Sequence, residues 1–175
     1  LLLCIILVFF VFFLILKQFL NFERDDKASY YFLKGVSNFG PELNYSLSEK
    51  YFYQALSHNH SFENAYLYLY HYYYITLSDF PKAEIISREY LFNFPNKELP
   101  YVLLASCLMK DGRLSESESL LKKAFDISNN SAMDITYLYS GKLYALLGDT
   151  ENSKKMLDKT LKTNSSQVTE FLVLG

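Results

Sequence analysis

The sequence has few of the residues that hold together a small disulfide-rich scaffold or keep a chain unfolded. Its 175 residues include 2 cysteines, 4 prolines and 6 glycines, and 21% of them are charged. Cys4 and Cys107 are too few for a disulfide framework or a four-cysteine zinc site. The low proline and glycine content excludes a collagen-like chain, and the 50% of hydrophobic residues excludes disorder. With a formal net charge of −2, the chain also lacks the basic surface of a nucleic-acid-binding protein.

The chain begins with a long apolar run, LLLCIILVFFVFFLIL, over residues 1–16. A helix continued to Phe22 would be about 33 Å long, and the hydrocarbon core of a bilayer is about 30 Å thick. The residues that follow the run are bulky or charged, which does not fit the cleavage site of a signal peptide. The run also lacks the polar face of a helix at the edge of a protein core. We therefore expect a transmembrane anchor over residues 1–22 and a juxtamembrane linker over residues 23–28.

The anchor also suggests where the rest of the chain is located. An N-terminal anchor commonly leaves its C-terminal domain on the far side of the membrane. The basic residues that flank the span are known on one side only, and counting positive charges needs both sides. We expect a single-pass membrane protein whose remaining part is periplasmic or otherwise non-cytoplasmic.

From Ala28 onward the sequence repeats at intervals of 34 to 36 residues. One series of small residues recurs at this interval: Ser48, Ala83, Ser117 and Ser153. A second series lies between these positions and consists of Gly35, His71, Ala105 and Gly141. In each repeat, the residue four positions before the member of this series is large and apolar. Two helices approach closely only where their side chains are small. The pattern therefore predicts helical hairpins whose paired helices meet at these positions.

This pattern resembles the tetratricopeptide repeat, a helix–turn–helix unit of 34 residues. The resemblance implies an all-α fold, an α-solenoid of about four hairpins that follows an N-terminal transmembrane helix. Neighbouring hairpins bury the apolar faces that one hairpin leaves exposed. The second unit departs from the family pattern at His71, Ser87 and Tyr90. A hairpin array of another family is the alternative, and it also gives an α-solenoid. The expected units are 29–61, 62–96, 97–131 and 132–166, with the start of a capping or further helix over 167–175.

No group of residues in the sequence has the spacing of a catalytic, metal or cofactor site. His58 and His60 supply two imidazoles, whereas a metal site needs three or four converging ligands. Ser119 and Lys122 have an SxxK spacing, but they lie in a repeat helix where serine and lysine are common. We therefore expect no enzymatic activity, no cofactor and no small-molecule substrate.

The resemblance also implies a concave groove, because the first helices of tetratricopeptide arrays line a groove that holds peptides or partner helices. The groove positions carried over through the repeat register are mostly apolar or aromatic: Phe32, Val36, Phe39, Tyr68, Tyr72, Ile75, Val102, Ser106, Met109, Leu138, Lys142 and Ala145. Six tyrosines between Tyr66 and Tyr74 either line this groove or pack between repeats. Only Lys142, with Lys110, is basic, so the binding of acidic chaperone tails known in the family is not expected.

An apolar groove predicts that the partner is an amphipathic helix or an apolar segment of another protein. We expect a non-catalytic, membrane-anchored protein–protein interaction scaffold or assembly factor. Two alternatives remain open. The first is a structural subunit of a large membrane-associated complex of the secretion, pilus or flagellar-motor type, which apolar residues on the convex side would favour. The second is the repeat portion of a longer membrane enzyme.

Overall fold

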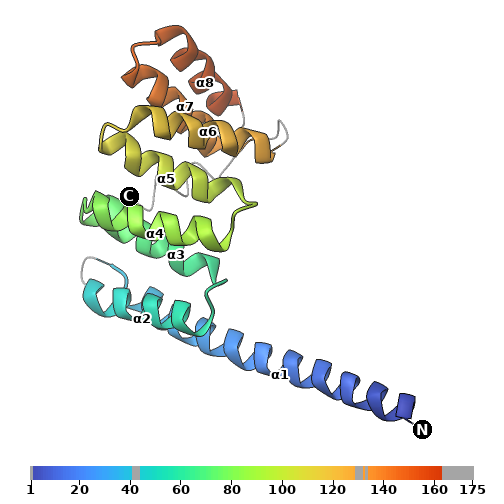
Figure 1. Ribbon diagram of the computed structural model, residues 1–175. Coiled ribbons are helices and arrows are strands. Elements are labelled where there is room, and N and C mark those ends of the chain that lie inside the picture. The colour runs from blue at the N-terminus through green and yellow to red at the C-terminus, as the bar shows by residue number, and fades with distance from the viewer. Residues whose placement is uncertain (1, 41–43, 129–131, 133, 163–175) are drawn as a thin grey trace. The chain divides into compact units, whose positions relative to one another are not determined.

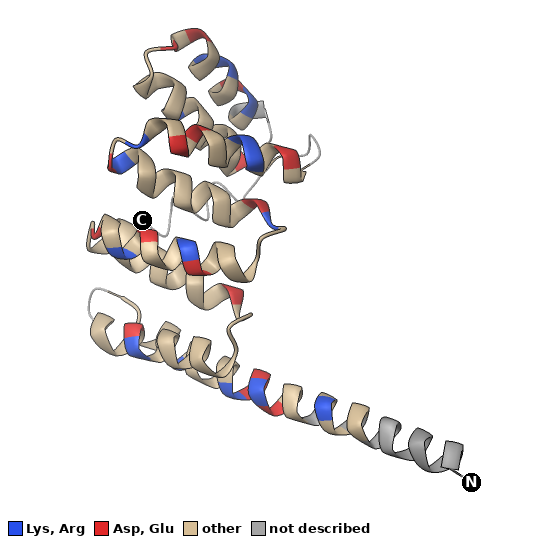
Figure 2. Ribbon diagram, viewed as in Figure 1, with Lys and Arg blue, Asp and Glu red and all other residues tan. Residues whose placement is uncertain are grey.

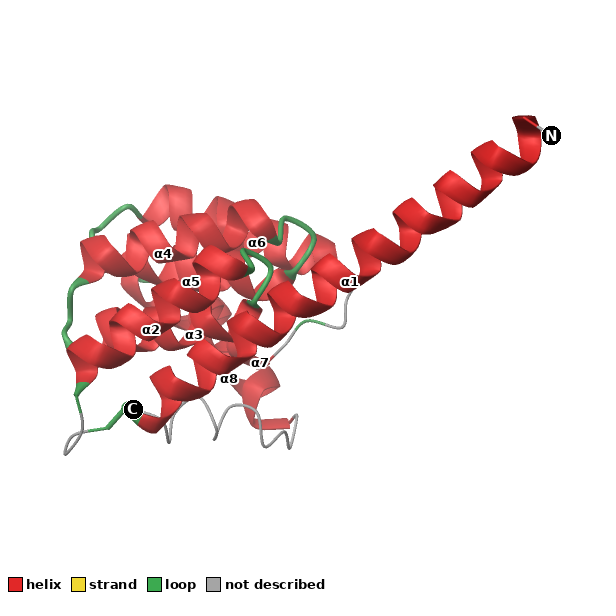
Figure 3. Cartoon of the chain, turned by 90° about the horizontal axis from the view of Figure 1, so that it is seen from below, coloured by secondary structure: helices red, strands yellow, loops and turns green. Residues whose placement is uncertain are grey.

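The computed structural model describes residues 2–40, 44–128, 132 and 134–162. Within these ranges the chain forms helices joined by short loops, without a strand (Figure 3). Two compact units can be distinguished, Leu1–Ala65 and Tyr66–Gly175. The helix expected over 167–175 lies outside the described residues.

The first unit is built on a long helix, α1 (Leu2–Ser37), against whose C-terminal part helix α2 (Tyr45–His58) packs (Figure 1). The two helices meet where α1 has no side chain. A Cβ atom placed on Gly35 would lie 2.5 Å from the ring of Phe52. The Ser48 hydroxyl donates a hydrogen bond of 2.8 Å to the carbonyl of Gly35. The first hairpin is therefore closed by a glycine on one helix and a serine on the other.

The expected membrane anchor is not supported by this helix. Over the residues that the structure describes, no helix is both long and apolar enough to span a bilayer. The location predicted from a single-pass anchor over residues 1–22 is therefore wrong. Within the expected span, the described side chains include the charged Lys17 and the polar Gln18 and Asn21, and charged groups are costly in hydrocarbon. Residues 23–28, expected to form a linker, continue α1 without a break.

The second unit stacks pairs of helices side by side (Figure 1). Its elements in chain order are α3 (Glu63–His71, which starts in the first unit), the π-helix η1 (Tyr72–Thr76), α4 (Phe80–Asn93), α5 (Glu98–Lys110), α6 (Leu114–Ser128), α7 (Asp134–Leu146) and α8 (Thr150–Lys162). Acidic and basic residues gather on α4, α6 and α8, whereas α5 and α7 carry few of them (Figure 2). Every residue from Val102 to Leu108 in α5 is buried, so this helix forms the centre of the unit.

The small residues of the repeat series lie between paired helices, as the sequence predicts. Ser48, Ala83, Ser117 and Ser153 are all buried. The hydroxyl of Ser117 donates to the carbonyl of Ala105 at 3.0 Å, and that of Ser153 donates to the carbonyl of Gly141 at 2.9 Å. These bonds repeat the Ser48–Gly35 contact of the first hairpin. A buried hydroxyl needs a partner, and here that partner also ties the two helices of the hairpin together.

The second hairpin departs from this arrangement, where the sequence also departs from the repeat pattern. His71 occupies the small position, and the helix widens into the π-helix η1 directly after it. Tyr90 occupies a position that is Ala55 and Ala124 in other hairpins, and its ring stacks on that of Tyr66 with centroids 5.4 Å apart. In a π-helix each hydrogen bond spans five residues instead of four. The side chains that follow are therefore rotated about the helix axis relative to those of a regular α-helix. The hairpin thus uses aromatic packing where the others use small residues.

The turns between paired helices provide a first test of the repeat. Ser78, Gly112 and Gly148 have φ values of 54°, 73° and 79° at equivalent turn positions. A left-handed conformation costs a non-glycine residue about 1–2 kcal/mol; glycine avoids this cost but loses more conformational freedom on folding. We expect Ser78→Gly to raise the free energy of unfolding by about 0.5–1 kcal/mol and Gly112→Ala to lower it by about 1 kcal/mol. Urea unfolding measures both, and a destabilising Ser78→Gly would contradict the equivalence of the turns.

Candidate functional site

A groove of about 650 Å³ lies on the second unit. Its walls come from the first helix of each hairpin, that is from α3 with η1, from α5 and from α7. The described residues that line it are Tyr70, His71, Tyr74, Ile75, Ser106, Met109, Lys110, Ile135, Leu138, Tyr139, Lys142, Ala145 and Leu146. Its size is within the usual range for pockets that bind ligands.

The floor of the groove is a cluster of tyrosine and serine side chains. The hydroxyls of Tyr70 and Ser106 are 2.6 Å apart. Because Ser106 donates its single proton to the carbonyl of Leu103 at 2.7 Å, the proton in the first bond comes from Tyr70. The rings of Tyr70 and Tyr74 stack with centroids 5.0 Å apart. The polar atom of Tyr70 is therefore satisfied within the protein, and its ring forms part of a fixed aromatic surface.

Burial keeps these tyrosines neutral. Removal from water raises the pKa of Tyr70 well above its ordinary value, and it also raises the pKa of Tyr74 and Tyr139. The groove therefore gains no negative charge from its phenols at any physiological pH. Among the described lining residues none is an aspartate or a glutamate.

Two lysines supply the positive charge of the groove. The ammonium of Lys142 lies 4.8 Å from the centroid of the Tyr139 ring, and that of Lys110 lies 5.3 Å from the Phe80 ring. Desolvation and then the charge of Lys110 lower the pKa of Lys142. Over the part of the chain that the structure describes, neither lysine forms an ion pair. The groove can therefore accept an anion.

The structure brings half of the sequence-predicted groove residues to this groove. Those that line it are Ile75, Ser106, Met109, Leu138, Lys142 and Ala145. Val102 is fully buried in a core cluster with Ala105 and Leu121. Tyr72 is also buried, with its ring 5.3 Å from that of Tyr73. Tyr68 is half-buried and is not among the residues that line the groove.

The other three predicted residues belong to the first unit. The ring of Phe32 packs against the rings of Phe52 and Phe62, at 5.8 Å and 5.2 Å. Phe39 contacts Tyr45 at 5.2 Å, and Val36 is half-buried. In that unit the two phenylalanines take part in packing between the helices of the first hairpin and the segment after it.

The sequence prediction identified the aromatic floor only in part. Tyr70 and Tyr74 belong to the tyrosine cluster for which lining the groove was one of two expected roles, whereas Tyr139 was not predicted; all three line the groove. The predicted positions were carried over by a fixed repeat spacing, which takes no account of the π-helix that begins at Tyr72. The dense run of tyrosines was the available signal, because a helix with aromatic residues on all sides must present some of them to a partner or a groove.

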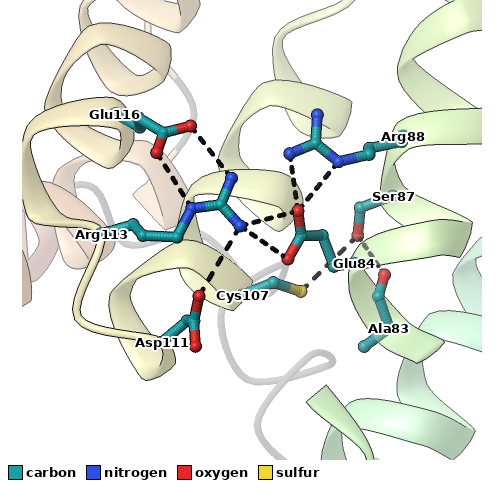
Figure 4. A network of polar contacts seen from close by, with 8 residues as sticks. All are labelled: Ala83, Glu84, Ser87, Arg88, Cys107, Asp111, Arg113 and Glu116. Atoms are coloured by element: carbon teal, nitrogen blue, oxygen red, sulfur yellow. Dashed lines mark hydrogen bonds and ion pairs between the residues drawn. The ribbon is translucent and has the colours of Figure 1, made fainter. Parts of the chain in front are cut away.

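A second polar cluster joins the α4 hairpin to the α5–α6 hairpin without forming a reactive site (Figure 4). The Glu84 carboxylate accepts hydrogen bonds from Arg88 at 2.6 Å and from Arg113 at 3.1 Å. Burial acts to raise the pKa of Glu84, but these hydrogen bonds outweigh it and hold the pKa below its ordinary value. Arg113 also pairs with Glu116 at 3.0 Å. All the charges in this cluster are compensated, so it serves to connect two hairpins.

Cys107 lies beside the same cluster and is buried. Its sulfur is 3.8 Å from the hydroxyl of Ser87. Burial raises the pKa of the thiol to about 11, so it stays protonated at physiological pH, whereas a reactive cysteine must be a thiolate. Within the described residues, no three histidine, cysteine, aspartate or glutamate side chains are placed to hold a metal ion.

Comparison with known proteins supports the hairpin array. No family model matches the chain, and no curated protein is similar to it at a significant level. Solved structures are similar, among them TTC0263, a thermophilic TPR protein of Thermus thermophilus. It is 20% identical, with a TM-score of 0.63 over 78% of this chain and 74% of its own. The chain has a TPR-like fold.

A second TPR structure, MamA of AMB-1, has a TM-score of 0.51 at 13% identity, over 83% of this chain and 97% of its own. The resemblance found in the sequence is thus confirmed for the fold. The walls of the groove are the first helices of successive hairpins in this fold.

Proposed function

We propose that this protein is a non-catalytic scaffold that binds segments of other proteins in the groove formed by α3 with η1, α5 and α7. The observation that carries this proposal is the groove itself, about 650 Å³ in volume. TPR-like neighbours are generally interaction modules without catalysis, which agrees with the proposal.

The composition of the groove suits a protein ligand. Apolar side chains such as Ile75, Met109 and Leu146 border a floor of tyrosines. Tyrosine offers a large contact area with little loss of conformational entropy. Ile75 is 43% exposed, and covering such surface yields about 25 cal/mol per Å². An amphipathic helix or an extended apolar segment would provide this cover.

A second candidate is a structural subunit that packs through the opposite face of the hairpins. Phe92 and Ile85, seven residues apart on α4, are 84% and 57% exposed. Neither residue lines the groove. Exposed apolar residues of this size commonly mark an interaction surface when they lie together, so a larger assembly could use α4.

Peptide selection can decide between the two faces. Random peptides of about 16 residues, roughly four helical turns, are displayed on phage and selected on the immobilised protein. Each recovered peptide is synthesised with blocked termini and titrated by calorimetry. We expect Ile75→Asp and Ala145→Asp to weaken binding about tenfold or more, equal to about 1.4 kcal/mol.

The matched controls are Ile85→Asp and Phe92→Asp, which add the same charge at exposed sites on α4. They should change the affinity less than about twofold, within about 0.5 kcal/mol. Binding that responds to the α4 variants instead would overturn the groove proposal and favour the structural subunit. A selection that yields no groove-dependent peptide would also contradict it.

A further inference from the structure

The positive charge of the groove sets a requirement on the ligand that the shape and the apolar surface of the groove do not set. We propose that the ligand segment carries an aspartate or glutamate side chain among apolar residues, and that its carboxylate binds between Lys110 and Lys142. This inference rests on the proposed function, since it names the chemistry of the partner for the same groove.

The first argument is that the described lining residues of the groove include two lysines and no carboxylate. Among the described residues, neither Lys110 nor Lys142 forms an ion pair. Their ammonium groups lie over aromatic rings instead, 5.3 Å and 4.8 Å from the ring centroids. Three other cations of the same unit are paired with carboxylates, since Arg88 and Arg113 bind Glu84 and Lys82 lies 3.4 Å from Asp79. Carboxylates are thus available in this chain for other cations, but none of the described ones lines the groove.

The second argument concerns the interaction between the two lysines. Lys110 acts on Lys142 as a like charge, and Lys142 is also partly removed from water. Both effects disfavour the charged ammonium. A carboxylate placed between the lysines would offset their repulsion and replace part of the lost hydration. Both lysines are exposed, so salt screens this attraction and binding should weaken as the ionic strength rises.

The third argument concerns the surroundings of the lysines. Lys110 follows Met109 in α5, and Lys142 lies one turn from Leu138 and from Leu146 in α7. A carboxylate that reaches the lysines must therefore be attached to a segment whose neighbouring side chains are apolar. The described lining residues include two lysines, so one acidic side chain suffices to neutralise most of their repulsion. A highly acidic segment would leave its remaining carboxylates against apolar walls, where they are unfavourable.

The test uses the groove-dependent peptides with blocked termini. Each peptide that contains aspartate or glutamate is remade with asparagine or glutamine at that position. We expect this change to weaken binding to the unaltered protein about tenfold, and to weaken binding to Lys142→Gln less than about twofold. In Lys110→Gln the effect of removing the peptide's acid should also be smaller than in the unaltered protein, but larger than in Lys142→Gln. Lys154→Gln, an exposed change on α8, is the matched control and should leave the tenfold difference intact.

A charge exchange makes the test independent of simple loss of binding. Lys142→Glu should reject the acidic peptides and bind the same sequences with lysine in place of the acid at least tenfold more tightly than the unaltered protein does. Melting temperatures of the variants establish that each one is folded. If groove-dependent peptides lack an acid, or bind equally with glutamine, this inference is wrong while the proposed function stands. A requirement for a free terminal carboxylate instead of an internal acid would also contradict it.

Discussion

Replacing Val102 by glutamate is expected to unfold most of the second unit. Val102 is fully buried and belongs to the core cluster that joins α5, α6 and α7. Glutamate at this position would be a charge without a partner in an apolar interior, and such groups cost several kcal/mol. We expect the free energy of unfolding to fall by about 4 kcal/mol or more, measured by urea denaturation followed by circular dichroism.

The control for this change is Met109→Glu, seven residues further along the same helix. Met109 borders the groove and packs against the core cluster, but it is only half-buried, so a charged side chain there can reach water. We expect a loss of about 1 kcal/mol, well below that of Val102→Glu. A Val102→Glu variant as stable as Met109→Glu would show that α5 presents a different face from the one described.

Restoring the repeat consensus at position 90 is expected to destabilise the protein. Tyr90→Ala would place alanine where other hairpins have Ala55 and Ala124. The Tyr90 side chain is buried, stacks on Tyr66 and contacts Phe94 at 5.3 Å. Removing a buried aromatic ring leaves a cavity that typically costs about 3–5 kcal/mol. Thermal and urea unfolding should both show a loss of this size.

Phe92→Ala is the matched control for that change, because it removes a ring of similar size from the exposed face of the same helix. Its effect on the free energy of unfolding should stay within about 0.5 kcal/mol. A stabilising Tyr90→Ala would mean that the second hairpin can close in the way the other hairpins do, without its aromatic packing.

The hairpin array could be predicted because it depends on residues that recur at a fixed interval. Ser48, Ala83, Ser117 and Ser153 are buried as expected, because close helix packing demands small side chains wherever the chain repeats. The continuity of α1 could not be predicted from the same reasoning. The charged run from Glu23 to Lys27 looks like a linker after an apolar segment, yet residues of this type are compatible with a helix.

The details of the groove were harder to predict than the fold. Val102 lies one turn before Ser106 in α5, yet it is buried in the cluster with Ala105 and Leu121 while Ser106 lines the groove. The π-helix after His71 changes the helical phase within one hairpin. The absence of a carboxylate near Lys142 among the described lining residues depends on which side chains of three separate helices meet, and sequence spacing does not contain this information.

The unbroken course of α1 has a mechanical consequence. Its 36 residues form a rod of about 54 Å, and the last turns of that rod are also the first helix of the first hairpin. Force applied near Leu14 would therefore act through a stiff lever on the Gly35–Ser48 contact, with no flexible joint between them to absorb a tilt or a twist.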